Sequence, residues 1–233
     1  EYSPPATKSD YWIPIRPATD TALFLGITRW LMDNKKYDVA FVKRFTDFPL
    51  LVRADNLKRL LAQDVFPNYQ LGLRSDGASF KLHGLTKEQY GKLGDYVVRD
   101  AKTGNLVPLT RDDVGAVMDA KGVDPQLDWA GKVKLVDGKE IEVLTLWAMY
   151  TEHLKDYDLD TVVDITHAPK DLILRLANDI ATIKPTALHI GEGINHWFHA
   201  TLANRAQFLP LMLTGNIGLP GAGCYTWAGN YKA

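Results

Sequence analysis

The chain of 233 residues contains one cysteine, Cys224. A single thiol cannot form an intrachain disulfide, and it cannot hold an iron–sulfur cluster, which needs about four ligands. Free cysteine is usually buried and inert, and the sequence neighbours of Cys224 offer no base that would activate a nucleophile. We therefore expect Cys224 to be a small buried residue.

Long apolar runs and an excess of one charge are also missing. No run of about 18 apolar residues is present, so we expect no membrane span in this chain. The 27 lysine and arginine residues nearly balance the 28 aspartate and glutamate residues, which argues against nucleic acid or an anionic membrane as a partner. The length suffices for a buried core in one or two domains. Because the chain begins without Met and stops within a pattern, we expect an internal fragment of a longer polypeptide.

The most informative pattern lies in the last third of the chain. A β-rich run, Thr186–Ile190, ends at Gly191-Glu192-Gly193, and a helical pattern over residues 200–213 leads to a second glycine cluster. A strand, a glycine turn and a helix build the ligand crevice of α/β sheets, where glycine lets the backbone approach a ligand closely. Since the third glycine of the dinucleotide fingerprint is missing, a tight turn without a ligand remains an alternative.

A second informative pattern lies near the N-terminus. Residues 11–15 predict a short strand, Pro17 breaks it, and an apolar helix is predicted over residues 21–32. Thr19 or Asp20 is a natural N-cap for that helix. A carboxylate at such a turn can instead accept both N–H groups on the Watson–Crick edge of a guanine, in a charge-assisted contact. The residues alone leave both roles of Asp20 open.

The remaining patterns predict further helices, one strand and two hairpins. Both hairpins alternate polar and apolar residues, as strands with one solvated face do, and the second has Asp137-Gly138 as a favoured two-residue turn. The predicted helices span residues 38–44, 146–156, 170–183 and 200–213, the predicted strand spans residues 50–53, and the hairpins span residues 95–110 and 132–143.

Two motifs are specific enough to indicate a family. Residues 16–20 read Arg-Pro-Ala-Thr-Asp, and residues 213–223 read Leu-Thr-Gly-Asn-Ile-Gly-Leu-Pro-Gly-Ala-Gly. Both resemble motifs of the molybdopterin oxidoreductases of the dimethyl sulfoxide reductase family, in which the position of Ala18 is usually glycine. In further detail the chain resembles the nitrate reductase and nitrite oxidoreductase catalytic (alpha) subunits, whereas residues 56–139 match the family poorly. That further likeness lies in residues 1–4, 10–12, 45–52 and 195–199.

The resemblance implies an α/β fold, with a Rossmann-like, mostly parallel sheet, flanking helices and a β-hairpin-containing insertion. We expect residues 1–53 to form part of an α/β molybdopterin-dinucleotide-binding domain and residues 54–145 to form the insertion. Residues 146–233 would continue the cofactor-binding region. Strands of such a sheet carry helices on both faces, so we expect Thr186–Ile190 to be buried.

The resembled family binds two molybdopterin guanine dinucleotides that hold one molybdenum (bis-MGD). Carried over position by position, the family's motifs imply a guanine contact, a shaped turn, a close backbone approach and nearby polar contacts. The residues concerned are Asp20 for the guanine, Pro17 and Thr19 for the turn, Gly191 and Gly193 for the approach, and Asn195 and His196 for the polar contacts. No catalytic or metal-ligating residue follows for this chain. The resemblance implies that the 4Fe–4S motif and the molybdenum ligand lie N-terminal to it.

A separate metal site at Glu192, His196 and His199 is a weaker reading of the same region. The pattern lacks the His-Glu-x-x-His spacing of zinc enzymes and has no obvious third ligand. We expect His199 to be a buried imidazole, and we expect Trp197 and Phe198 to pack rather than to stack.

The resemblance implies an oxidoreductase that interconverts nitrate and nitrite by oxygen-atom transfer, in a direction that the residues do not fix. Its implied partners are an iron–sulfur electron-transfer subunit and a haem or membrane-anchor subunit, on the cytoplasmic or periplasmic face of a membrane-associated complex. Related enzymes that act on another oxyanion, such as selenate or chlorate, or on a hydrocarbon such as ethylbenzene, remain alternatives. A non-catalytic nucleotide-binding scaffold domain is a further alternative.

Overall fold

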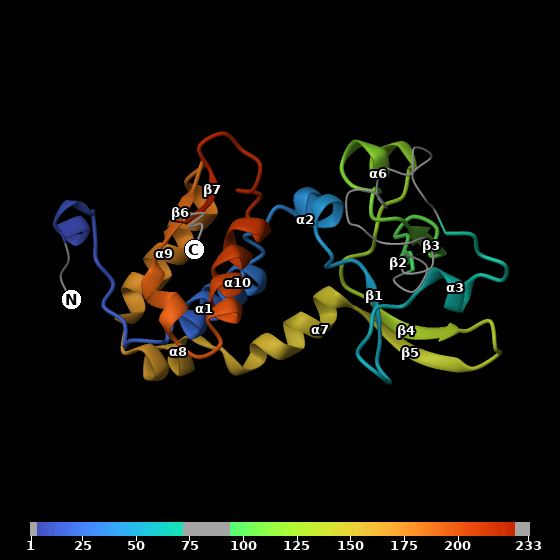
Figure 1. The fold of residues 1–233 in the computed structure, drawn as a ribbon, viewed down its shortest axis with the longest axis horizontal. Coiled ribbons are helices and arrows are strands. Elements are labelled where there is room, and N and C mark those ends of the chain that lie inside the picture. The colour runs from blue at the N-terminus through green and yellow to red at the C-terminus, as the bar shows by residue number, and fades with distance from the viewer. Residues whose placement is uncertain (1–3, 72–93, 227–233) are drawn as a thin grey trace, which may run out of the picture. The chain divides into compact units, whose positions relative to one another are not determined.

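The computed structural model describes residues 4–71 and 94–226, and the chain divides into two compact units. Unit 1 combines residues 1–42 with residues 151–233, and unit 2 comprises residues 43–150. The boundaries fall inside two helices, α2 (Val39–Phe45) and α7 (Leu146–His153), as Figure 1 shows. Unit 1 is therefore assembled from two segments that are far apart in the sequence.

Unit 1 contains helices, short 3₁₀ turns and a parallel pair of strands. The pair is in register, with Leu188 opposite Cys224. The helices are α1 (Asp20–Asp33), α8 (Leu159–Thr166), α9 (Lys170–Thr182) and α10 (Ala200–Leu213), the 3₁₀ turns are η1 (Pro4–Lys8), η2 (Leu154–Asp156) and η3 (Glu192–His196), and the strands are β6 (Ala187–Ile190) and β7 (Gly223–Thr226).

Helix α1 is the centre of unit 1, because α8, α9 and α10 all contact it. Figure 1 shows α10 alongside α1. The apolar residues of α1 recur every three or four positions, and two of them, Ile27 and Leu31, are fully buried. Gly26 permits close packing on α8, since a Cβ there would lie 2.5 Å from Cγ2 of Val162. The position of α1 is thus fixed on several sides.

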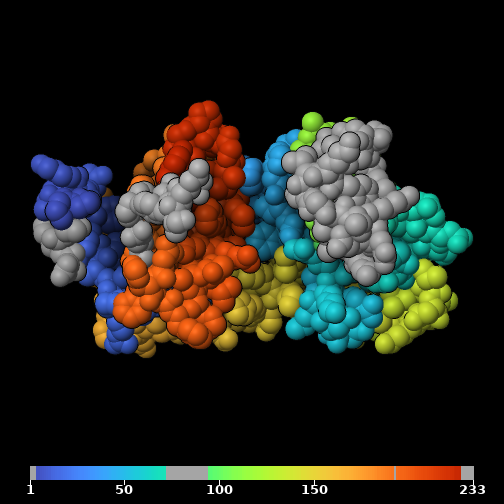
Figure 2. Space-filling view, in the orientation of Figure 1, coloured from blue at the N-terminus to red at the C-terminus, as the bar shows by residue number. Residues whose placement is uncertain are grey.

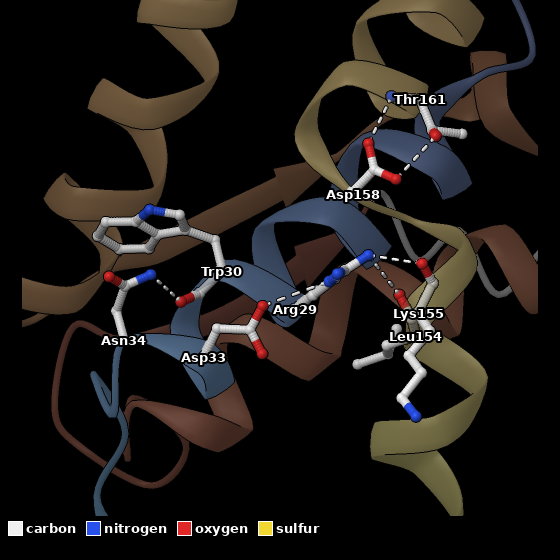
Figure 3. Close-up of polar contacts among 8 residues, drawn as sticks. All are labelled: Arg29, Trp30, Asp33, Asn34, Leu154, Lys155, Asp158 and Thr161. Atoms are coloured by element: carbon white, nitrogen blue, oxygen red, sulfur yellow. Dashed lines mark hydrogen bonds and ion pairs between the residues drawn. The ribbon is translucent and has the colours of Figure 1, made fainter.

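Helix α1 is also tied to the segment that leads into α8 (Figure 3). Arg29 donates from Nη1 to the carbonyl oxygen of Lys155 at 2.6 Å, and its Nε lies 3.3 Å from Oδ2 of Asp33. Asp158 caps α8 by accepting the N–H of Thr161 at 2.8 Å, and this hydrogen bond holds the pKa of the Asp158 carboxyl below its usual range. The hydrogen bond from Arg29 thus ties α1 to η2, which leads directly into the capped start of α8.

Unit 2 is built from antiparallel sheets and short helices. One sheet has the strand order β1-β5-β4, and the other is the hairpin β2-β3. The strands are β1 (Leu51–Arg53), β2 (Tyr96–Arg99), β3 (Leu106–Leu109), β4 (Ala130–Lys134) and β5 (Glu140–Thr145), and the helices are α3 (Ala62–Val65) and α6 (Ala116–Ala120).

The core of unit 2 follows from the alternation along its strands. In β5, Ile141 and Val143 are buried in a cluster with Leu51, whereas Glu140 and Glu142 are exposed. Charged side chains on every second residue are what a sheet with one solvated face requires. The hairpins predicted over residues 95–110 and 132–143 are confirmed as β2-β3 and β4-β5.

The predicted α/β class is confirmed. Among the described strands only the pair β6-β7 in unit 1 is parallel, so the Rossmann-like, mostly parallel sheet stays a prediction. The expectation that Thr186–Ile190 is buried is wrong, because Ala187 and His189 are exposed. Among the described strands, β6 pairs with β7 alone, so it lies at the edge of a two-stranded sheet. Cys224 is half-buried, and burial raises the pKa of its thiol to about 11, so the thiolate is scarce at neutral pH.

The compact units divide after residues 42 and 150, whereas the sequence placed the boundaries after residues 53 and 145. The assignment of these parts to a cofactor-binding domain and an insertion stays a prediction. Among the helices that the structure describes, none is long and apolar enough to cross a membrane.

Candidate functional site

An open pocket of about 300 Å³ in unit 1 brings together the motif of residues 16–20 and the glycine turn that follows Thr186–Ile190. One wall comes from the segment that enters α1, and the other comes from the turn that follows β6. The residues that line it are Ile15, Pro17, Ala18, Asp20, Gly191, Gly193, Ile194 and Trp197. Four of the seven predicted site residues are thus gathered in one pocket, although about 170 positions separate the walls in the sequence.

The first wall is a tight turn closed by Thr19. The N–H of Thr19 donates to the carbonyl oxygen of Arg16 at 3.3 Å, and its hydroxyl donates to the same oxygen at 2.6 Å. Ala18 between them has a φ of 68°, in the left-handed region that favours glycine. The turn therefore holds Ala18 in a backbone conformation that glycine adopts more readily.

Arg16 anchors this turn to the end of α8. Its N–H donates to the carbonyl oxygen of Thr166 at 2.7 Å, and its guanidinium lies 2.6 Å from Nε2 of His167. His167 ends α8 in the left-handed conformation, with a φ of 57°. The first wall is consequently held by α8 as well as by α1.

The extended segment before the turn is anchored to α9. The hydroxyl of Tyr11 donates to Oδ2 of Asp179 at 2.8 Å, and the guanidinium of Arg175 lies 4.1 Å from the centre of the Tyr11 ring. Burial and this hydrogen bond raise the pKa of Tyr11 to about 12. Residues 11–15 belong to no strand among the described residues, so the strand predicted there is not found.

Asp20 is the first residue of α1 and presents its carboxylate to the pocket. Thr19 holds the N-cap position, and neither residue makes a side-chain capping bond to the helix. Within the described residues, the half-buried carboxylate of Asp20 has no hydrogen bond and no ion pair. Its charge still interacts favourably with the N-terminal end of the helix dipole. Both carboxylate oxygens are therefore available to a ligand.

Gly191 and Gly193 form the opposite wall, and neither the backbone conformation nor the packing at these two positions requires glycine. Gly191 has φ −94° and ψ 170°, which any residue adopts, and neither glycine has a φ in the left-handed region. A Cβ built on either residue meets no atom within 4 Å. Packing and backbone geometry would thus tolerate alanine, so what these glycines keep is open space beside the backbone.

Three predicted site residues, Thr19, Asn195 and His196, do not line the pocket. Thr19 shapes the turn, as described above. Asn195 accepts a hydrogen bond at its Oδ1 from Nδ2 of Asn204 in α10, at 2.7 Å. His196 is exposed at the end of η3. Their contact with a cofactor stays a prediction.

The structure adds pocket residues that the sequence reasoning missed, namely Ile15, Ala18, Ile194 and Trp197. Each lies within three positions of a predicted residue, and the apolar character of Ile15 and Ile194 beside polar motifs was the available signal. The packing expected for Trp197 and Phe198 is not found, because they are 48% and 89% exposed. The prediction of a buried imidazole for His199 is also wrong, since this residue is exposed, with a φ of 60°.

Comparison with known proteins extends the likeness to the whole chain, although no family model matches it. The chain is 33% identical to the respiratory nitrate reductase subunit alpha of Haloferax mediterranei and 30% identical to the perchlorate reductase subunit alpha of Dechloromonas aromatica. It is 23% identical to the respiratory nitrate reductase 1 alpha chain of Escherichia coli. Each match covers all of this chain and 22%, 25% and 24% of the relative, respectively.

The chain therefore spans about a quarter of the length of these curated relatives. The matches cover all of this chain, so they also run through residues 56–139, where the sequence analysis expected a poor match to the family. The relatives include alpha subunits of nitrate, perchlorate and chlorate reductases. On this homology, the chain belongs to the dimethyl sulfoxide reductase family of molybdopterin oxidoreductases.

Proposed function

We propose that this chain forms part of the cradle for a molybdenum bis-MGD cofactor in an enzyme that interconverts nitrate and nitrite. The observation that carries the proposal is the pocket in which Asp20, without a partner among the described residues, lies opposite Gly191 and Gly193. A free carboxylate and two bare stretches of backbone are the features that a nucleotide end of a cofactor requires.

The residues of the pocket fit a guanine nucleotide in chemistry and in size. Asp20 would accept the two N–H groups of the guanine edge, and Gly191 and Gly193 would admit the phosphate and sugar close to the backbone. Pockets for small ligands measure about 300–1,000 Å³. A pocket of about 300 Å³ thus suits one end of a dinucleotide rather than the whole of it.

When bound, such a cofactor supplies oxygen-atom transfer between molybdenum and an oxyanion, while the protein binds and orients it. The residues of this chain would act on the nucleotide end, with Pro17 and Thr19 fixing the turn and Asn195 and His196 offering polar contacts beside it. The proposal assigns the 4Fe–4S cluster and the molybdenum ligand to parts of the polypeptide outside this chain. An iron–sulfur subunit and a haem or membrane-anchor subunit are the proposed electron-transfer partners.

The two named relatives that are at least 30% identical to the chain are named for different oxyanions. The 33% identical relative is named for nitrate and the 30% identical relative for perchlorate. Nitrate is proposed first because a second relative, from Escherichia coli, is also named for it. Reduction of perchlorate or chlorate by the same site is the second candidate.

The proposal is tested by the molybdenum content per polypeptide of the full-length protein and its Asp20→Asn variant. We expect close to one atom per chain in the parent protein and a large loss in the variant. The matched control is Asp171→Asn, which removes a first-turn carboxylate from α9 outside the pocket. Each substitution weakens a helix-dipole interaction worth about 0.3–1 kcal/mol, so a loss of metal in Asp20→Asn alone identifies a cofactor contact.

Two results would contradict the proposal. Full molybdenum in Asp20→Asn would remove this residue from the site, and the absence of both molybdenum and tungsten from the parent protein would favour a non-catalytic scaffold. Rates with nitrate, nitrite, chlorate and perchlorate on the metal-loaded protein would then decide between the two candidate reactions, which are the interconversion of nitrate and nitrite and the reduction of perchlorate or chlorate.

A further inference from the structure

Trp197 is the one aromatic residue among those that line the pocket of Asp20, Gly191 and Gly193. Its side chain is 48% exposed. In the described part of the chain, its indole makes no ring contact, no cation–π contact and no hydrogen bond. Trp197 therefore presents a large unpaired ring to an open pocket.

The backbone on both sides of Trp197 is ordered by hydrogen bonds. Its N–H donates to the carbonyl oxygen of Ile194 at 3.4 Å, and its own carbonyl oxygen accepts the N–H of Ala200 at 3.2 Å. The residue thus links η3 to the first turn of α10. The backbone that carries the ring is thus placed in advance, so little backbone entropy is lost when a ligand packs on the indole.

A nucleotide base offers an edge and two faces to a protein. The carboxylate of Asp20 can recognise the edge of a guanine, but it leaves both faces without a contact. The faces of bases pack well on tryptophan, because every base has a π face and stacking on an aromatic side chain tolerates any base. In the pocket, Ile15 and Ile194 supply further apolar surface beside the indole.

We infer that Trp197 is the stacking platform for the guanine base whose edge Asp20 recognises. The inference rests on the proposed function, because it names a further residue of the same site. The neighbouring aromatic residue, Phe198, is not suited to stack on the base in this way. It is 89% exposed, yet its ring contacts His199, with 4.0 Å between the ring centres, and it does not line the pocket.

The surface around these residues is open to solvent. Figure 2 shows the C-terminal part of unit 1, in orange to red, at the surface that faces the viewer. A guanine that enters the pocket would cover the indole and exclude water from it. Burial of this apolar ring contributes to binding, and it lowers the indole's exposure to quenchers in solution.

The test uses GMP and IMP as probes of the full-length, cofactor-free protein. IMP lacks the 2-amino group of guanine, so it keeps the stacking surface and loses one of the two contacts to Asp20. We expect Trp197→Ala to weaken the binding of both nucleotides about tenfold or more. Trp197→Phe should keep most of the affinity while it loses the fluorescence change on binding. The matched control, Phe198→Ala, should bind both nucleotides as the parent protein does.

The outcomes separate the stacking role from the proposed function. If Trp197→Ala binds GMP as tightly as the parent protein, the stacking role is wrong. The base site would still stand if Asp20→Asn lost the preference for GMP over IMP. If the parent protein binds neither nucleotide and Asp20→Asn retains its molybdenum, both the stacking role and the proposed cradle are overturned.

Discussion

Replacing Gly191 by alanine should change stability and cofactor retention in opposite directions. The backbone of Gly191 is extended, with φ −94° and ψ 170°, and an added Cβ meets no atom within 4 Å. Alanine at a compatible position restricts the unfolded chain and stabilises a protein by about 0.4–1 kcal/mol. We therefore expect the cofactor-free Gly191→Ala protein to gain about that much free energy of unfolding.

The same methyl group would occupy space that the proposed cofactor needs. Forcing an extra methyl into a close contact costs about 1–3 kcal/mol, which weakens binding by roughly 5–150-fold. The assay compares urea unfolding of the cofactor-free proteins with molybdenum per polypeptide of the loaded proteins. Gly218→Ala is the control for the stability argument, because its Cβ also meets nothing within 4 Å but its φ is 86°. That variant should lose stability, since the left-handed conformation penalises a side chain.

Two results would refute this reasoning. A cofactor-free Gly191→Ala protein that is less stable than the parent would mean that the space beside Gly191 is filled. Full retention of molybdenum by a stable Gly191→Ala protein would mean that no cofactor approaches the backbone at this residue.

Three further substitutions test how the site is supported. Ala18→Gly should raise the free energy of unfolding by up to about 1 kcal/mol, because it relieves a left-handed residue; a loss in denaturant unfolding would contradict this. Gly26→Ala should cost about 1–3 kcal/mol through contact with Val162, and Val162→Ala in the double variant should restore part of it. Because the pKa of Tyr11 is raised from 10.0 to about 12 by burial and Asp179, its stabilising effect is present below pH 10 and lost between pH 10 and 12. Tyr11→Phe should flatten the fall of stability over that window, and an unchanged pH profile would show that Tyr11 is not responsible.

Local patterns were sufficient to predict both hairpins and the longer helices, but not the short helices α3, α6 and α8. The helix predicted over residues 200–213 is α10, and the one predicted over residues 170–183 ends one residue later than α9. Helical periodicity and two-residue turns are properties of neighbouring residues, so they can be read without knowing the tertiary structure. The short helix α8 was not predicted, because its apolar residues cover too few turns to show a period.

Long-range features could be predicted only in part. The pairing of β6 with β7 joins strands that are separated by a whole helix, and no local signal sets the register of such a pair. For the site, the resemblance implied that Asp20, Gly191 and Gly193 all contact the cofactor, and these three residues line one pocket. The exposure of Trp197 could not be predicted, because an aromatic residue next to a glycine motif is compatible with packing as well as with ligand contact.

The division of unit 1 into two segments has a consequence for the order in which the protein folds on the ribosome. Helix α1 leaves the ribosome before unit 2, but the helices that cover its apolar residues Ile27 and Leu31 are made only after all of unit 2. Domains fold as units during synthesis, at about 5–20 residues per second. Unit 2 can complete its core during this interval, while α1 still exposes apolar surface that attracts chaperones. One wall of the pocket, residues 15–20, is therefore synthesised before unit 2 and the other wall, residues 191–197, after it, so the pocket can form only once both have been made.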